Sequence, residues 1–198
     1  MRVIAGRLGG RRLRAPAGRV TRPTSDRVKE AVFAMLGDVE GLRVLDLFAG
    51  SGALGIEALS RGAQAAVFVE RDVAALKTLN GNLEALGIAS GPVQVRRADA
   101  LDALRAAASR QETYDLVFID PPYGRARPAS TASESPSADR WGPQLSAILP
   151  SLLSPGARVV VESDRRAPLE LPHTGAGELE LERHKRYGDT SITIHRHQ

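Results

Sequence analysis

The sequence predicts an α/β domain in which helices cover both faces of a mostly parallel β-sheet. Two observations predict this class. Short apolar segments alternate along the chain with longer segments whose apolar residues recur at helical spacing. The short segments are almost continuously apolar, as are parallel strands that are buried on both faces. Only the last two strand-like segments alternate polar and apolar residues, and they predict an antiparallel hairpin at the sheet edge.

The first predicted elements are a short hairpin over residues 2–14 and a helix. In the hairpin, apolar residues flank a turn at Gly9-Gly10. The helix follows because Thr24 or Ser25 can cap it and the next residue is acidic. Its apolar residues recur at helical spacing, at Val28, Ala31, Val32, Met35 and Leu36.

Strands and helices then alternate along the chain. The predicted strands span residues 42–48, 65–70, 93–96, 114–120 and 157–163. The predicted helices between them span residues 53–60, 73–86, 101–108 and 144–153, and Gly87 and Pro155-Gly156 act as helix stops. The final hairpin joins residues 178–186 and 190–197 through Tyr187-Gly188-Asp189.

The length of 198 residues fits one domain with a short appendage. We expect a basic extension over residues 1–38 and a main domain over residues 39–198, with a flexible loop at 124–140 that is rich in Ser, Ala and Pro. No apolar run approaches the roughly 20 residues that a membrane helix needs, and the amino terminus lacks the apolar segment of a signal peptide. The sequence therefore favours a cytoplasmic protein that does not enter a membrane.

The net charge of +4 is unevenly distributed along the chain. Residues 1–30 contain nine Lys or Arg and two acidic residues, whereas the remaining residues contain 18 basic and 21 acidic side chains. A basic arm on a neutral-to-acidic body suggests a partner that carries phosphates, and the alternative is a solubilising tail. Arg183, Lys185 and Arg186 likewise either extend a phosphate-binding surface or are simply solvated.

A glycine-rich turn joins the first main strand to its helix in the segment LDLFAGSGALG. Gly50, Gly52 and Gly55 satisfy the spacing G-x-G-x-x-G, and Glu70 follows 20 residues after Gly50, at the end of the next strand. This arrangement is typical of a cofactor whose ribose lies over a tight turn and a helix N-terminus. The alternative is an ordinary strand–helix turn.

Two carboxylates favour S-adenosylmethionine over a nicotinamide as that cofactor. Asp46 ends the strand before the glycines, where it would repel a pyrophosphate but attract the ammonium group of a methionine moiety. That attraction is worth roughly 1 kcal/mol at 4 Å in water and more in a cleft. Asp99 follows the strand predicted at residues 93–96 and can reach the adenine. Glu70 would accept hydrogen bonds from the ribose hydroxyls. Taken singly, Asp46 and Asp99 could be helix caps or turn formers.

The segment VFIDPPYG, residues 117–124, ends a core strand on a carboxylate, two prolines and an aromatic residue. The exocyclic amino group of a base is a poor nucleophile because its lone pair is delocalised into the ring. Asp120 and the Pro121 carbonyl can accept both amino hydrogens on a backbone that the prolines stiffen, so that the lone pair points at a methyl donor. Tyr123 can stack on the base, which is worth roughly 1–3 kcal/mol. The alternative is a proline-ended strand with a surface tyrosine.

The chain contains no cysteine, which excludes disulfides, thiolate metal sites and the cysteine adduct through which pyrimidine carbon-5 methylation normally proceeds. Amino-group methylation needs no such nucleophile. With the segments RVIAGRLGGRRLRAP, RPTSDRVKEAVFAML, VLDLFAGSGALGIEALSRGA, FVERD and FIDPPY, the sequence resembles the bacterial 16S rRNA guanine N(2)-methyltransferase family that modifies guanine 966, the small-subunit rRNA methyltransferase D family. The similarity covers nearly the whole chain.

The resemblance implies a Rossmann-like class I S-adenosylmethionine-dependent methyltransferase fold with seven strands and a small amino-terminal hairpin and helix. It implies that the substrate is 16S rRNA in the assembled 30S subunit or its late assembly intermediate. We expect the protein to act as a monomer and to need no metal. The predicted cofactor-binding residues are Asp46, Phe48, Gly50, Ser51, Gly52, Glu70, Arg71, Asp99, Ala100 and Asp120. The predicted catalytic residues around the target base are Asp120, Pro121, Pro122 and Tyr123. The predicted rRNA-binding residues are Arg2, Arg7, Arg11, Arg12, Arg14, Arg22, Thr24 and Arg27.

Two other functions are compatible with parts of this pattern. An adenine 6-amino methyltransferase of DNA or RNA also uses a D-P-P-Y motif, although the DNA enzymes usually carry an added target-recognition domain. A non-catalytic RNA-binding assembly factor could keep the fold without the reaction. The methylated nucleoside and the binding of the cofactor distinguish these alternatives.

Overall fold

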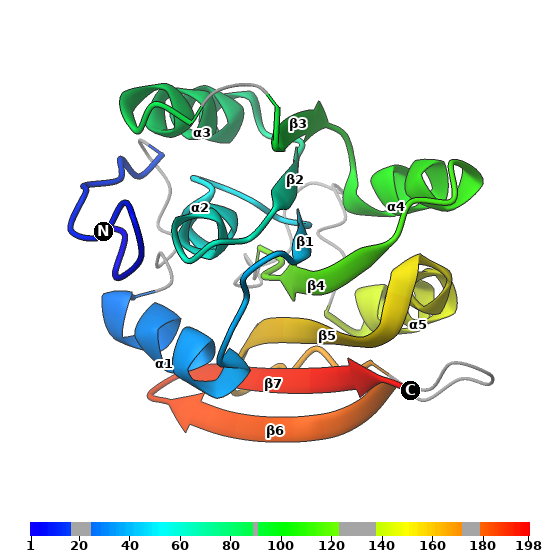
Figure 1. Ribbon diagram of the computed structural model, residues 1–198. Helices are drawn as coiled ribbons and strands as arrows, with labels where there is room; N and C mark the ends of the chain where they lie inside the picture. The colour runs from blue at the N-terminus through cyan, green and yellow to red at the C-terminus, as the bar shows by residue number, and fades with distance from the viewer. Residues whose placement is uncertain (17–24, 89–90, 123–137, 172–178) are drawn as a thin grey trace, which may run out of the picture.

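The structure is a computed structural model, and it describes residues 1–16, 25–88, 91–122, 138–171 and 179–198, without the side chains of residues 138–140. A seven-stranded sheet has the order β3-β2-β1-β4-β5-β7-β6 (Figure 1). The strands are β1 (Arg43–Asp46), β2 (Ala65–Glu70), β3 (Val93–Arg97), β4 (Tyr114–Ile119), β5 (Leu153–Asp164), β6 (Leu179–Tyr187) and β7 (Thr190–His197). Strands β1 to β5 pair in parallel, and β7 pairs antiparallel with both β5 and β6. The predicted sheet and its carboxyl-terminal hairpin are confirmed.

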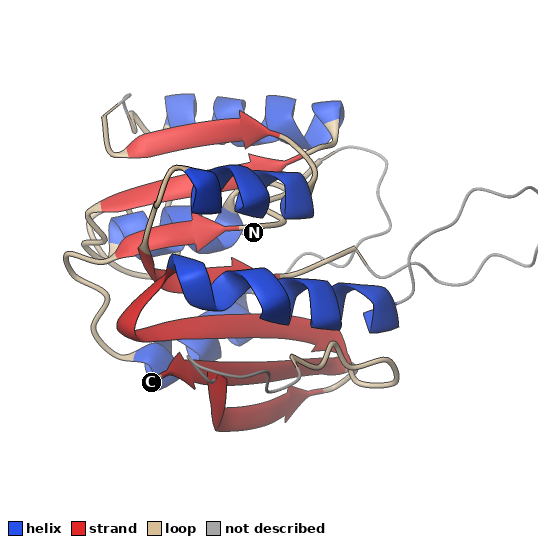
Figure 2. Cartoon of the chain, turned by 90° about the vertical axis from the view of Figure 1, so that its right-hand side faces the viewer, coloured by secondary structure: helices blue, strands red, loops and turns tan. Residues whose placement is uncertain are grey.

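Helices cover both faces of this sheet (Figure 2). They are α1 (Asp26–Leu36), α2 (Ala53–Ser60), α3 (Val73–Ala85), α4 (Ala100–Ser109), α5 (Ala138–Ile148) and the short 3-10 helix η1 (Leu149–Leu152). One buried cluster joins one face of the sheet to α1, α2 and α3 through residues such as Phe33, Ile56 and Leu79. The other joins the opposite face to α4, α5 and η1 through residues such as Leu104 and Leu145. The two clusters produce the three-layer packing that nearly continuous apolar strands require.

The helix α1 begins where the sequence predicts it. Ser25 is the N-cap, and its hydroxyl accepts a hydrogen bond from the Val28 amide at 3.2 Å. The buried face is formed by Val28, Lys29, Val32, Phe33 and Leu36, whereas the predicted Ala31 and Met35 are only half-buried. The buried face is thus rotated relative to the prediction and includes a lysine.

Residues 2–14 form the predicted hairpin only in part. The chain reverses and makes an isolated antiparallel bridge between Arg2 and Arg12, but this described segment contains no strand. Backbone hydrogen bonds join the two arms, from the Val3 amide to the Arg11 carbonyl oxygen at 2.9 Å and from the Leu13 amide to the Met1 carbonyl oxygen at 3.0 Å. Other backbone groups bond to α2, and Gly6 lies so close to it that a Cβ there would stand 1.8 Å from the Ser60 carbonyl oxygen. The Arg7 amide donates to the same oxygen at 2.8 Å. Pairing between the two arms and contact with α2 therefore together set the shape of this segment.

The predicted boundaries around residues 144–157 are wrong. Helix α5 begins at Ala138 and runs through Pro143, whose missing N–H removes one hydrogen bond from the helix. Strand β5 begins at Leu153, so Pro155-Gly156 lies inside a strand rather than ending a helix. A register shift against β4 marks a bulge there, and Gly156 has φ of 78°, a conformation that favours glycine.

Several predictions concern residues outside the described part of the chain. They include Arg22, Thr24, Tyr123 and the loop predicted at 124–140 as far as residue 137, after which α5 begins. In the residues that the structure describes, none of the helices combines the length and the apolar composition that crossing a membrane requires.

Candidate functional site

Carboxylates gather at the carboxyl edge of the sheet because four neighbouring parallel strands end on them. Asp46 is level with Phe68 on β2 and Phe118 on β4. Two residues beyond these partners, Glu70 ends β2 and Asp120 follows β4. Asp99 follows β3 and is the N-cap residue of α4. The structure thus brings together the four acidic residues that the sequence assigned to the site, at the edge where α/β sheets bind ligands.

The glycine turn between β1 and α2 depends on its glycines. Gly50 and Gly52 have φ of 54° and 80°, in the left-handed region. A Cβ at Gly52 would stand 2.3 Å from Leu79 Cδ1, and one at Gly55 would stand 2.3 Å from Phe68 Cε1. The first two glycines therefore allow the turn, and the last two allow α2 to pack closely on α3 and β2.

Glu70 holds this turn in place. One carboxylate oxygen accepts a hydrogen bond from the Gly50 amide at 2.9 Å, and the other accepts one from the Asp72 amide at 2.8 Å. Each carboxylate oxygen has a further lone pair, so these bonds leave capacity for hydroxyl donors. Glu70 therefore has a structural role that the sequence did not reveal, and this role is compatible with ribose binding.

Asp46 is almost completely buried, with 3% of its surface exposed. Burial raises the pKa of its carboxyl group to about 7, the charge of Glu70 adds to the rise, and a hydrogen bond from the Gly55 amide at 3.0 Å opposes it. A cationic group beside Asp46 would favour the charged carboxylate. This electrostatic environment fits an ammonium group and disfavours a phosphate.

Asp99 and Arg71 form the adjoining part of the edge. The Asp99 carboxylate accepts a hydrogen bond from the Leu101 amide at 3.1 Å and lies 3.5 Å from the guanidinium of Arg71, which is 61% exposed. The alternative that Asp99 caps a helix is therefore confirmed. Ala100, the first residue of α4, is buried directly behind it.

The Asp-Pro-Pro segment leaves the sheet directly after β4. Asp120 is half-buried, Pro121 is buried and Pro122 is exposed. Phe48, just beyond β1, packs edge-to-face against Trp141 of α5, with ring centroids 5.3 Å apart and an interplanar angle of 90°. The predicted stacking residue Tyr123 lies outside the described residues.

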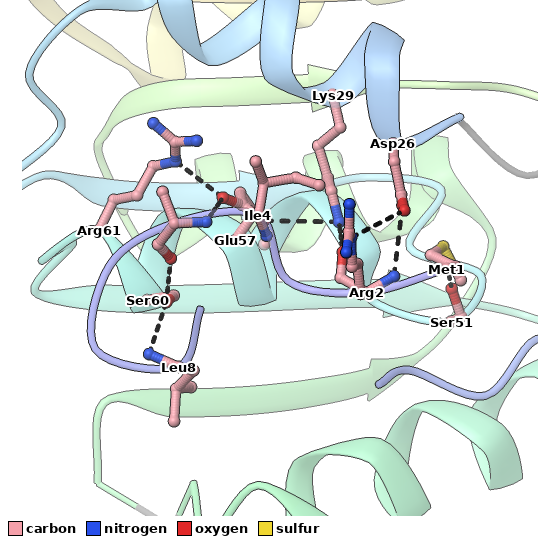
Figure 3. A network of polar contacts seen from close by, with 12 residues as sticks. Met1, Arg2, Ile4, Leu8, Asp26, Lys29, Ser51, Glu57, Ser60 and Arg61 are labelled. Carbon is pink, nitrogen blue, oxygen red and sulfur yellow. Dashed lines mark hydrogen bonds and ion pairs between the residues drawn. The ribbon is translucent and has the colours of Figure 1, made fainter. Parts of the chain in front are cut away.

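A buried ionic junction, which the sequence analysis missed, joins the amino-terminal segment to α2 (Figure 3). Glu57 and Lys29 have fully buried side chains, 3.4 Å apart between Nζ and Oε2. The Glu57 carboxylate also accepts hydrogen bonds from the amides of Ile4 at 2.7 Å and Ala5 at 3.0 Å, and from Arg61 Nε at 2.8 Å. Burial lowers the pKa of Lys29, although Glu57 opposes that shift. A charged residue in the otherwise apolar helix 53–60 was the available sequence signal.

Asn82 of α3 links the same segment to the glycine turn. Its side-chain oxygen accepts a hydrogen bond from the Arg14 amide at 2.8 Å. Its side-chain nitrogen donates to the carbonyl oxygens of Arg14 at 3.0 Å and Ser51 at 2.9 Å. Ser51 also lies against Met1, with Oγ 4.0 Å from the sulfur. The basic segment is therefore fixed beside the turn rather than attached as a free tail.

The predicted RNA-binding arginines mostly present exposed side chains. Arg2 lies 3.4 Å from Asp26 at the start of α1, and Arg11 donates to the Ala85 carbonyl oxygen at 2.8 Å. The remaining exposed members are Arg7, Arg12, Arg14 and Arg27, and Arg22 and Thr24 lie outside the described residues. The described residues also hold no group of three or more His, Cys, Asp or Glu side chains that could bind a metal ion.

The strand order, the glycine turn and the strand-end carboxylates together define a class, the Rossmann-like methyltransferase domains. The family model described as Conserved hypothetical protein 95 matches residues 1–196. The chain is 36% identical over 173 residues to ribosomal RNA small subunit methyltransferase D of Haemophilus influenzae, covering 87% of this chain and 83% of that one. It is 42% identical over 197 residues to YlbH of Bacillus subtilis, a candidate rRNA methyltransferase by its name, covering 99% of this chain and 98% of that one.

A solved structure agrees with these relatives. The Escherichia coli protein yhhF, described as a candidate methyltransferase, matches with a TM-score of 0.76 and 33% identity, covering 100% of this chain and 98% of that one. The chain belongs to the family of ribosomal RNA small subunit methyltransferase D. The resemblance noted from the sequence segments is thereby confirmed.

Proposed function

We propose that this protein transfers a methyl group from S-adenosylmethionine to the exocyclic 2-amino group of a guanine in 16S rRNA, at position 966, within the assembled 30S subunit. The observation that carries the proposal is the row of strand-end carboxylates, with the Asp120-Pro121-Pro122 segment beside a cofactor-type glycine turn. The names of the relatives support rRNA of the small subunit as the substrate. Because the proposed substrate is ribosomal, we expect the protein to act in the cytoplasm, and to do so as a monomer.

The described residues fit this cofactor. Asp46 would pair with the ammonium group, which favours its charged form. Glu70 would accept hydrogen bonds from the ribose hydroxyls with its remaining lone pairs. Asp99, Ala100 and Arg71 would border the adenine, and Phe48, Gly50, Ser51 and Gly52 would line the turn beneath the cofactor. When bound, S-adenosylmethionine supplies an electrophilic methyl group on a positively charged sulfur.

Asp120 and Pro121 have the chemistry that an amino-group acceptor needs. The Asp120 carboxylate and the Pro121 carbonyl would each accept one amino hydrogen and localise the nitrogen lone pair. Pro121 and Pro122 hold these acceptors on a stiff backbone, so little reorganisation is needed at the moment of reaction. A nitrogen–carbon bond would form as the carbon–sulfur bond breaks, and Asp120 would accept the proton that the nitrogen then loses. Tyr123 would stack on the base.

A substitution at Asp120 tests this assignment. Asp120→Ala should lower the rate of labelled methyl transfer to unmethylated small subunits by about 100-fold or more, as loss of a positioned electrostatic group does. The dissociation constant for S-adenosylmethionine should stay within about threefold of the wild-type value, measured by calorimetry. An equal loss of cofactor affinity would contradict the role of Asp120 toward the base. Wild-type protein that binds S-adenosylmethionine but methylates no rRNA would instead favour an assembly factor.

A further inference from the structure

A second group of basic side chains lies away from the amino-terminal arginines, and we name it the hairpin cluster. Two members follow β5, and three lie in the carboxyl half of the edge strand β6. The members are Arg165, Arg166, Arg183, Lys185 and Arg186, and all five are exposed.

The register of the sheet places this cluster at the edge that carries the Asp-Pro-Pro segment. Asp120 comes directly after the last β4–β5 pair and is level with Glu162. Glu162 pairs with Ile192 of β7, and Ile192 pairs with Lys185 of β6. Lys185 therefore lies in the same row as Asp120, three strands away, or about 14 Å at the usual strand spacing. That distance equals about four nucleotide steps along a duplex strand.

Charge is segregated along β6. Glu180 and Glu182 occupy its amino half, which is level with the far end of β7, whereas the basic members occupy the half at the site edge. Three carboxylates border the cluster. Glu182 Oε1 lies 3.9 Å from Arg183 Nε. Asp164 accepts a hydrogen bond from the Arg166 amide at 2.8 Å, and Asp189 lies in the turn between β6 and β7. Five basic side chains against these three carboxylates leave the site end of the hairpin positive.

The cluster continues the basic surface of the amino-terminal segment around the sheet edge. Figure 1 shows the amino terminus, the start of α1 and the turn between β6 and β7 on the same side of the molecule. Ile192 belongs to the buried cluster that includes Val32 and Phe33 of α1, and directly opposite residues of an antiparallel pair share a face. Lys185 therefore lies on the α1 face of the sheet. Arg27, which is exposed at the start of α1, and Lys185 therefore lie on the same side of the sheet.

We propose that the hairpin cluster binds phosphates of the rRNA substrate on the side of the Asp120 site that the amino-terminal segment does not reach. This inference rests on the proposed function, because it assigns a second contact surface to the same substrate. A row of guanidinium and ammonium groups at an exposed sheet edge suits a phosphate backbone and reads no sequence. The cluster would hold the RNA beyond the target nucleotide, while the amino-terminal segment holds it on the other side.

The test compares two triple variants of the full chain that lose the same charge. One is Arg183→Gln/Lys185→Gln/Arg186→Gln. The control is Arg43→Gln/Arg110→Gln/Arg196→Gln, which removes exposed arginines from the amino edge of the sheet and its neighbourhood. Affinity for unmethylated small subunits is measured over a range of salt concentrations. Cofactor affinity and the melting temperature are measured alongside.

The slope of log affinity against log salt concentration should become less negative by about 2, because three phosphate contacts are lost. At 0.1 M salt this corresponds to a loss on the order of 100-fold in affinity, with the rate at saturating substrate and the cofactor affinity unchanged. The control should keep the wild-type slope. If the hairpin variant binds with the slope and affinity of the control, this inference is wrong while the proposed function stands. If wild-type protein binds no rRNA, the proposed function fails and the inference fails with it.

Discussion

Breaking the Lys29–Glu57 pair should destabilise the protein strongly and release its amino-terminal segment. Both side chains have no exposed surface, so neither charge can turn to water when its partner is removed. Removing one partner of a buried ion pair costs about 3–5 kcal/mol. In Lys29→Met, Glu57 keeps its hydrogen bonds to Arg61 and to two backbone amides, so we expect the free energy of unfolding to fall by about 3 kcal/mol. In Glu57→Gln, the buried ammonium loses its counter-charge, so we expect the upper end of the range.

These costs are measurable by urea unfolding and by heating. At about 2–4 °C per kcal/mol for a chain of this size, Lys29→Met should lower the melting temperature by about 6–12 °C. The double variant should cost clearly less than the sum of the two single variants, because it leaves no unpaired buried charge. Hydrogen exchange gives a local readout, since the amides of Ile4 and Ala5 donate to Glu57 and should exchange faster in Glu57→Gln. Single variants within about 0.5 kcal/mol of wild type would refute the reasoning, since that is the range of ordinary surface substitutions.

Four further predictions concern the cofactor edge. The pKa of Asp46 is about 7 rather than its usual 3.8, so its carboxyl group becomes charged as the pH rises through about 7. Cofactor affinity measured by calorimetry should therefore rise over that range, and Asp46→Asn should remove the pH dependence. The cofactor-free protein should lose stability as the pH rises from about 4 to about 7, because there the folded state holds a proton that the unfolded chain has released, and a flat urea midpoint would contradict this. Gly52→Ala should lower the unfolding free energy more than the matched Gly50→Ala, because only at Gly52 would a Cβ stand 2.3 Å from another side chain, and equal losses would count against this account. Asn82→Ala should lower the free energy of unfolding by about 1–3 kcal/mol and weaken both cofactor binding and rRNA binding, because Asn82 bonds to both Arg14 and Ser51. Weakened rRNA binding with unchanged cofactor binding would contradict a role of Asn82 in holding the glycine turn.

Much of the fold was predictable because its signals are local. Alternating apolar segments with strong helix signals gave the strand and helix order, and the glycine spacing marked the turn before α2. The four strand-end carboxylates were predictable as a group because parallel strands bring their carboxyl ends to one edge. The bulge at Pro155-Gly156 was not, because the same dipeptide ordinarily ends a helix and only pairing with β4 shows that it lies inside a strand.

The junction around Glu57 shows what local signals leave out. Glu57, Lys29 and Asn82 bond to segments more than 25 residues away in the chain, so no sequence window contains both partners. The amino-terminal segment was predicted as a hairpin because its turn residues are typical of one, and its two arms do pair, but several of its other backbone donors bond to α2. Long-range polar partners therefore decide the conformation of the segment whose charge the sequence did reveal.

The identity of the methylated nucleoside tests the central claim most directly. Wild-type protein is incubated with unmethylated small subunits and S-adenosylmethionine that carries a labelled methyl group, and the rRNA is then digested to nucleosides. The account predicts that the label appears in 2-methylguanosine and maps to position 966 of 16S rRNA. Label in 6-methyladenosine, or no label in rRNA from protein that binds the cofactor, would contradict it.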